Sequence, residues 1–214
     1  MKIRLVTYLL IFLFCTISYG QKIAVLKYGG GGDWYANPTA LPNLIEFSNE
    51  HNKTKLALDP ETVEISSIEL FNYPMVFMTG HGNVYFTDAD AKNLKNYLES
   101  GGFLHISDNY GLDKYVRREM KKVFADLDFQ EIPYDHPIYH QTFDFDQLPK
   151  IHEHDGKPPQ GFGLFYQGRL VCFYDYEADL SDGWESQEIH NNPEEVRLKA
   201  LQMGANIITY AFSF

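Results

Sequence analysis

Short apolar runs alternate along the chain with longer segments in which apolar residues recur every three or four positions. The clearest runs are residues 22–28, 75–78 and 103–107, and a polar turn follows each of them. Runs of this kind predict parallel strands that are buried on both faces of a sheet. Residues 62–65 predict a further short strand.

Segments with helical spacing lie between and after these runs, at residues 39–49, 87–100 and 112–127 and from Asn192 onward. Thr87 and Asp90 form a near capping box at the start of the second segment, and Gly101 ends it. Gln167-Gly168, between two apolar runs, predicts a β-hairpin. The alternation predicts a single α/β domain over residues 21–214, a three-layer sandwich with a mainly parallel sheet.

Two polar segments interrupt this pattern, at residues 136–157 and 175–192. The first holds four histidines and several carboxylates. Its prolines exclude a long helix or a central strand. A loop so rich in ligand-type side chains is where function is expected first.

The residues that follow predicted strands are candidates for binding a small polar ligand, because ligands of doubly wound sheets bind beyond the carboxyl ends of the strands. Trp34 and Trp184 can stack on a sugar ring, or each can pack on the rim of the sheet as a lid residue. The glycines before Asp33 lack the lysine and Ser/Thr of a phosphate-binding loop, so close backbone approach explains them better. The expected ligand-binding residues are Gly31, Asp33, Trp34, His81, Asp108, Asn109 and Trp184.

Imidazole and carboxylate together suit Zn²⁺ or another divalent metal, although the spacing matches no zinc signature. The expected metal ligands are His136, His140, His152, His154 and Asp155. Two alternatives remain open. The same side chains can form a hydrogen-bond network that pins the loop. Carboxylates such as Asp108 and Glu177 can also pair as general acid and base without a metal.

Four motifs carry a family resemblance, at residues 26–35 (LKYGGGGDWY), 78–82 (MTGHG), 101–109 (GGFLHISDN) and 152–155 (HEHD). With them the chain resembles an uncharacterised bacterial family, a domain of unknown function grouped with class I glutamine amidotransferase-like proteins. More distantly it resembles the ThuA-like sugar-utilisation proteins. The resemblance covers nearly the whole chain after residue 20 and implies a flavodoxin-like fold.

The amidotransferases place a nucleophilic cysteine at the turn between a strand and a helix. The corresponding strand end, residues 105–108, holds no cysteine, and Cys172 lies inside a predicted strand, where a thiol is usually inert. Two functional classes remain. The preferred one is an exported binding protein without amidotransferase catalysis. The alternative is a metal-dependent hydrolase acting on a saccharide or a cell-envelope compound.

The first 20 residues predict a cleaved signal peptide, since Lys2 and Arg4 precede a short apolar run and a small-residue site. We therefore expect a periplasmic or secreted protein without a membrane span after cleavage. Cleavage moves the formal charge from −11 to −13, which disfavours nucleic acid as a partner. The sequence leaves the oligomeric state open.

The predicted export has a direct test. Mass spectrometry of the protein recovered from the cell envelope should show a chain that begins near Gln21. A mature chain that retains Met1 would contradict it.

Overall fold

Seven strands form one mixed sheet in the computed structural model, which describes residues 20–213. The strands are β1 (Ile23–Lys27), β2 (Glu61–Glu64), β3 (Met75–Gly80), β4 (Phe103–Asp108), β5 (Gln130–Glu131), β6 (Gln160–Tyr166) and β7 (Arg169–Tyr176). Their order across the sheet is β2-β1-β3-β4-β7-β6-β5. The neighbours from β2 to β7 pair in parallel, whereas β6 is antiparallel to both β7 and β5.

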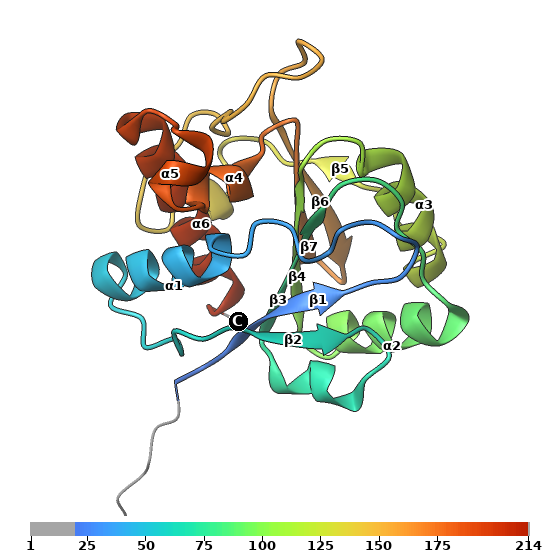
Figure 1. Cartoon of the computed structure of the whole chain (residues 1–214). Coiled ribbons are helices and arrows are strands. Elements are labelled where there is room, and N and C mark those ends of the chain that lie inside the picture. The colour runs from blue at the N-terminus through green and yellow to red at the C-terminus, as the bar shows by residue number, and fades with distance from the viewer. Residues whose placement is uncertain (1–19, 214) are drawn as a thin grey trace, which may run out of the picture.

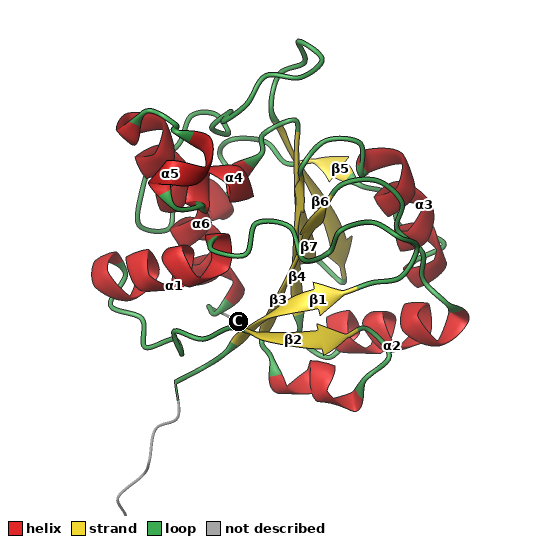
Figure 2. Ribbon diagram, viewed as in Figure 1, coloured by secondary structure: helices red, strands yellow, loops and turns green. Residues whose placement is uncertain are grey.

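Helices cover both faces of this sheet (Figures 1 and 2). They are α1 (Ala40–His51), α2 (Asp88–Glu99), α3 (Asp113–Val123), α4 (Leu180–Trp184), α5 (Gln187–His190) and α6 (Glu194–Ala211), with short 3-10 helices η1 (Ile68–Asn72) and η2 (Pro137–Tyr139). Figure 1 shows α1, α4 and α6 on one side of the sheet and α2 and α3 on the other. The predicted α/β class, with helices on both faces of a mainly parallel sheet, is confirmed.

Two hydrophobic cores explain why the central strands read as continuous apolar runs. Successive residues of a strand point to opposite faces, so Phe77 packs in the core beneath α1 and α6 while Val76 and Met78 pack in the core beneath α2 and α3. Every residue of β3 and β4 is buried. The three predicted central strands are confirmed as the adjacent parallel strands β1, β3 and β4.

The local signals for α2 and for the hairpin are also confirmed. The Thr87 hydroxyl accepts a hydrogen bond from the Asp90 N–H at 3.1 Å, and the Asp90 carboxylate accepts the Thr87 N–H at 2.9 Å. Gln167 and Gly168 join β6 to β7 with φ angles of 50° and 80°, the left-handed region that such tight turns require.

Two expectations about regular structure are wrong. Helix α3 ends at Val123 rather than at residue 127, because Phe124 adopts an extended backbone and turns its ring into the core. Residues 175–192 are not an open loop either. They contain α4 and α5, and Leu180 and Trp184 are buried in the core that α1 and α6 share.

The predicted signal peptide, residues 1–20, lies outside the described residues except for Gly20. Among residues 20–213, no helix has both the length and the apolar character that a membrane crossing needs.

Close packing of α6 on α1 and α4 gives a test of this layer. A Cβ added at Gly204 would lie 2.5 Å from Leu44 Cδ1 and 2.8 Å from Trp184 Cε2. Gly204→Ala should therefore destabilise the protein by about 1–2 kcal/mol in urea unfolding, because overpacking outweighs the gain of about 1 kcal/mol in helix propensity. Lys199→Ala, on the exposed side of the same helix, is the control and should stay within about 0.5 kcal/mol of the wild type. An unchanged or increased stability of Gly204→Ala would contradict tight packing here.

Candidate functional site

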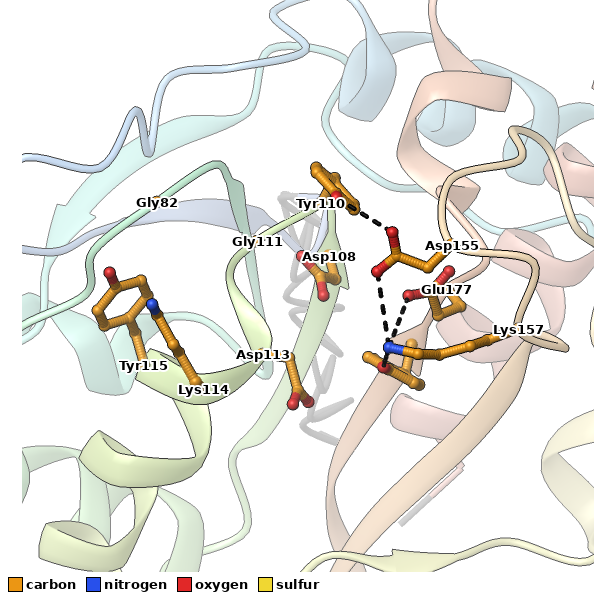
Figure 3. Close-up of a pocket in the computed structure, with 11 residues that line it drawn as sticks. Gly82, Asp108, Tyr110, Gly111, Asp113, Lys114, Tyr115, Asp155, Lys157 and Glu177 are labelled. Atoms are coloured by element: carbon orange, nitrogen blue, oxygen red, sulfur yellow. Dashed lines mark hydrogen bonds and ion pairs between the residues drawn. The ribbon is translucent and has the colours of Figure 1, made fainter.

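A crevice opens at the carboxyl ends of β4 and β7. The chain leaves β4 toward α3 on one face of the sheet, and it leaves β7 toward α4 and α6 on the other face. Ligands of open α/β sheets bind where the connections of adjacent strands diverge in this way. A cleft of about 390 Å³ lies there (Figure 3). Its lining residues are Gly82, Asp108, Tyr110, Gly111, Asp113, Lys114, Tyr115, Asp155, Lys157, Tyr176 and Glu177.

Asp108, the last residue of β4, is the most buried carboxylate of this cleft, with 4 % of its surface exposed. Its Oδ1 accepts the Leu112 N–H at 3.0 Å, and its Oδ2 accepts the Tyr174 hydroxyl at 2.9 Å. Burial raises the pKa of Asp108 to about 6, and the nearby charges of Asp113 and Asp179 act in the same direction. The two hydrogen bonds lower the pKa but do not compensate for burial. Asp108 therefore changes its charge close to neutral pH.

Tyr110 forms the turn between β4 and α3 in an uncommon backbone conformation. Its φ is +80°, which is costly for a residue with a large side chain. The ring is about half exposed and stacks on the His154 ring with 4.6 Å between centroids. The hydroxyl donates to Asp155 Oδ1 at 3.1 Å. The turn thus holds an aromatic ring at the cleft, where Figure 3 shows it beside Asp155.

Lys157 places a positive charge among the carboxylates on the other wall of the cleft (Figure 3). Its Nζ donates to the Tyr176 hydroxyl at 2.9 Å and lies 3.6 Å from Asp155 Oδ2 and 3.7 Å from Glu177 Oε1. Glu177 is buried and has a left-handed backbone, with φ of +56°. The cleft therefore offers carboxylates, an ammonium group and tyrosine rings side by side, which suits a polar ligand with several hydroxyl groups.

A second polar cluster lies beyond β7, and His152 is at its centre. His152 Nδ1 is 2.9 Å from Asp182 Oδ2 and 3.5 Å from Asp179 Oδ2. Hydrogen bonds raise the pKa of His152 to about 10, and the bond to Asp179 contributes more than the bond to Asp182. His154 Nε2 donates to Asp179, and His190 Nε2 is 3.9 Å from Asp182 Oδ2. We name Asp182, His190, His152 and Asp179 the histidine–aspartate cluster.

The structure brings only some of the predicted metal ligands together. His152 and His154 lie together at the carboxyl edge of the sheet, and Asp155 lines the cleft. His136 lies elsewhere, since its ring is 5.5 Å from that of Tyr210, which in turn packs 6.1 Å from Phe103 at the start of β4. The prediction that His136 belongs to the same site is therefore wrong.

His140 does not belong to that site either. It follows η2, and its Nε2 donates to the Tyr134 carbonyl at 2.7 Å while its Nδ1 lies 3.1 Å from Asp144 Oδ1. Among residues 20–213 it shares no contact with the histidine–aspartate cluster. The reason for both errors is that η2 packs against the C-terminal half of α6, where the Asn206 side chain binds the backbone of Tyr139 and Phe143.

Only some of the predicted ligand-binding residues lie at the cleft. Asp108 lines the cleft, and Asn109 beside it is buried, with its side-chain oxygen accepting the Ser181 hydroxyl at 2.9 Å. Trp184 is fully buried, and its indole N–H donates to the Ala200 carbonyl at 2.8 Å. The structure therefore packs Trp184 between α4 and α6, outside the residues that line the cleft.

The glycine loop and its neighbours form a separate part of the edge, after β1 and β3. Asp33 accepts hydrogen bonds from the backbone and the ring of His81. Gly31 and Trp34 lie in the same loop, outside the cleft. A Cβ added at Gly32 would lie 2.7 Å from the Asn83 carbonyl oxygen. Close approach of two backbones thus accounts for a glycine there.

A buried network beneath the cleft resembles a nucleophilic triad in composition only. His105 Nε2 donates to Asp175 Oδ2 at 2.7 Å, and the Ser107 hydroxyl donates to Asp175 Oδ1 at 3.0 Å. The carboxylate lies between serine and histidine, so the serine has no base. Burial lowers the pKa of His105 to about 3 and raises that of Asp175. Cys172 is fully buried too, and burial raises the pKa of its thiol.

Sequence reasoning missed Tyr110, Lys157 and Tyr176 in the cleft, and Asp179, Asp182 and His190 in the cluster. The second group had a usable signal, since residues 175–192 follow an apolar run and are rich in carboxylates. Nothing in the sequence indicated that Tyr110 adopts a positive φ.

The raised pKa of Asp108 predicts a specific dependence of stability on pH. An acid whose pKa is higher in the folded than in the unfolded state stabilises the fold below its unfolded pKa, near 4, and this contribution disappears as the pH rises through about 6. Asp108→Asn does not titrate. Its unfolding free energy relative to the wild type should therefore rise by up to about 3 kcal/mol between pH 4 and pH 8. Urea unfolding measures this, with the exposed Asp126→Asn as control. Parallel pH profiles of wild type and Asp108→Asn would contradict the assignment.

The comparisons with known proteins agree with an uncharacterised family. The matching family model is described as a domain of unknown function (DUF4159), and it covers residues 22–212. A comparison with curated proteins finds no match. Because the family model spans almost the whole chain, this protein belongs to the DUF4159 family.

Proposed function

We propose that this protein is an exported α/β domain that binds a small polyhydroxylated ligand, such as a saccharide of the cell envelope, in the cleft at Asp108. The observation that carries the proposal is the composition of that cleft. Three tyrosines, four carboxylates and two lysines surround about 390 Å³ at the divergence of β4 and β7. Carboxylates accept hydrogen bonds from sugar hydroxyls, and tyrosine rings stack on the apolar faces of sugar rings.

The negative charge of the cleft and of the whole chain limits the classes of ligand that fit. Carboxylates outnumber the lysines of the cleft, and the formal charge of the whole chain is −11. Anionic ligands such as polyphosphates and nucleic acids are therefore disfavoured. Neutral and cationic sugars fit this field. The proposed export, to the periplasm or the medium, rests on residues 1–20 of the sequence.

The finer fold assignment is also a proposal. The parallel order β2-β1-β3-β4-β7 is the order of a flavodoxin-like sheet, which supports a relation to the class I glutamine amidotransferase-like proteins. The turn after β4, where the amidotransferases carry their nucleophile, holds Tyr110 with a φ of +80°. No thiol is available there, because Cys172 is buried within β7. A binding role without amidotransferase chemistry follows.

A metal-dependent hydrolase is the second candidate, and two observations favour it. Asp108 changes protonation near neutral pH, as a general acid requires. The histidine–aspartate cluster holds imidazole and carboxylate groups of the kind that bind catalytic metals. Turnover of a bound saccharide separates the two candidates, since a binding protein returns the ligand unchanged.

Calorimetry with a panel of neutral, amino and acidic saccharides tests the binding role. We expect at least one neutral or amino sugar to bind, and Tyr110→Ala to weaken that binding about two- to tenfold, because loss of an aromatic stacking contact costs about 0.5–1.5 kcal/mol. Tyr110→Phe, which keeps the ring, should lose less. Tyr35→Ala is the control, since Tyr35 is exposed outside the cleft. Equal affinities of Tyr110→Ala and wild type for every bound sugar would remove the cleft from the proposal.

A further inference from the structure

Three ligand atoms of the histidine–aspartate cluster converge on one point. His152 Nδ1, Asp182 Oδ2 and His190 Nε2 all lie within 4.8 Å of one another. Two of the separations are 2.9 Å, from His152 to Asp182, and 3.9 Å, from His190 to Asp182. Around a tetrahedral metal with bonds of 2.0–2.1 Å, ligand atoms lie about 3.4 Å apart. The two distances to Asp182 lie on either side of this value, and the two imidazoles lie within 4.8 Å of each other, so the three atoms are close to coordination spacing.

The remaining polar atoms of two ligands are already held by amide groups. His152 Nε2 donates to Asn192 Oδ1 at 3.1 Å, which fixes the ring and directs Nδ1 toward the carboxylates. Asp182 Oδ1 accepts the Asn37 amide at 2.6 Å, which leaves Oδ2 for a further partner. Metal-binding histidines and carboxylates typically have such outer contacts, which set their orientation.

Asp179, in the same cluster, provides a second, independent observation that favours a bound cation. Its side chain is 1 % exposed, and its backbone has a φ of +52°. Oδ2 lies 3.5 Å from His152 Nδ1, whereas Oδ1 has no hydrogen-bond partner among residues 20–213. A buried carboxylate oxygen without a partner is costly. A cation coordinated by the Asp179 carboxylate offsets that cost.

We propose that His152, Asp182 and His190 bind a divalent transition metal of the zinc class, with Asp179 as the carboxylate that completes the site. Two imidazoles with carboxylates select Zn²⁺, Co²⁺ or Ni²⁺ over Mg²⁺ and Ca²⁺, which prefer oxygen ligands alone. The site differs from the cleft and does not depend on which ligand the cleft binds.

Titration of the purified, chelator-treated protein with Zn²⁺ by calorimetry, and with Co²⁺ by visible absorption, tests the site without any saccharide. We expect one tight site and the visible bands of Co²⁺ with nitrogen and oxygen ligands. His190→Ala should weaken Zn²⁺ binding by more than about 100-fold, and Asn37→Ala by about 10–100-fold. His140→Ala is the matched control, because His140 is a half-exposed histidine away from the cluster, and it should bind Zn²⁺ as the wild type does.

Two results would overturn the proposal. One is the absence of Zn²⁺ and Co²⁺ binding by the folded wild type, which would leave the cluster as a set of ion pairs. The other is undiminished binding by both His190→Ala and Asp182→Asn, which would place the metal elsewhere. Circular dichroism of each variant verifies the fold, and His190 is exposed enough that its removal should not disturb it. Saccharide binding by metal-free protein is measured separately, so either proposal can fail alone.

Discussion

Burial of the central strands on both faces is the constraint on which the rest of this molecule depends. Because β3 and β4 present no residue to solvent, polar side chains that reach solvent collect where these strands end. The connections after β4 and β7 then leave for opposite faces, and the divergence keeps that edge open. The position of the cleft is thus a consequence of how the apolar residues are covered.

The same edge concentrates negative charge that the fold only partly neutralises. Asp108, Asp175 and Asp179 are all buried. Burial raises the pKa of Asp108 and of Asp175, and the nearby charge of Asp179 acts in the same direction on both. His152, Lys150 and Lys157 are among the positive charges within reach of these carboxylates and of Glu177. Such an arrangement is expensive for a purely structural surface. Glu177 and Asp179 in the same region also have left-handed backbone conformations. Strain of this kind is found mainly at functional sites, so it too favours a functional role for this edge.

The sequence predicted the layers better than it predicted the site, for a physical reason. Continuous apolar runs and capping signals are local, so β1, β3, β4 and α2 follow from neighbouring residues alone. Whether two loops meet is decided by long-range packing. His136 and His152 belong to one polar segment, yet η2 docks on α6 and carries His136 to the far end of the sheet. Trp184 looked like a loop residue because the short helix that buries it has too few residues to show periodicity.

The stacked rings of Tyr110 and His154 have a thermodynamic meaning of their own. Tyr110 borders the cleft, while His154 is hydrogen-bonded to Asp179 in the cluster. A molecule that displaces the tyrosine ring must also disturb the imidazole and the carboxylate behind it. Binding at the proposed cleft and at the proposed metal site would therefore be linked through Tyr110, His154 and Asp179, and such linkage is reciprocal. If a ligand in the cleft changes the free energy of metal binding at the cluster, the metal changes the free energy of ligand binding in the cleft by the same amount.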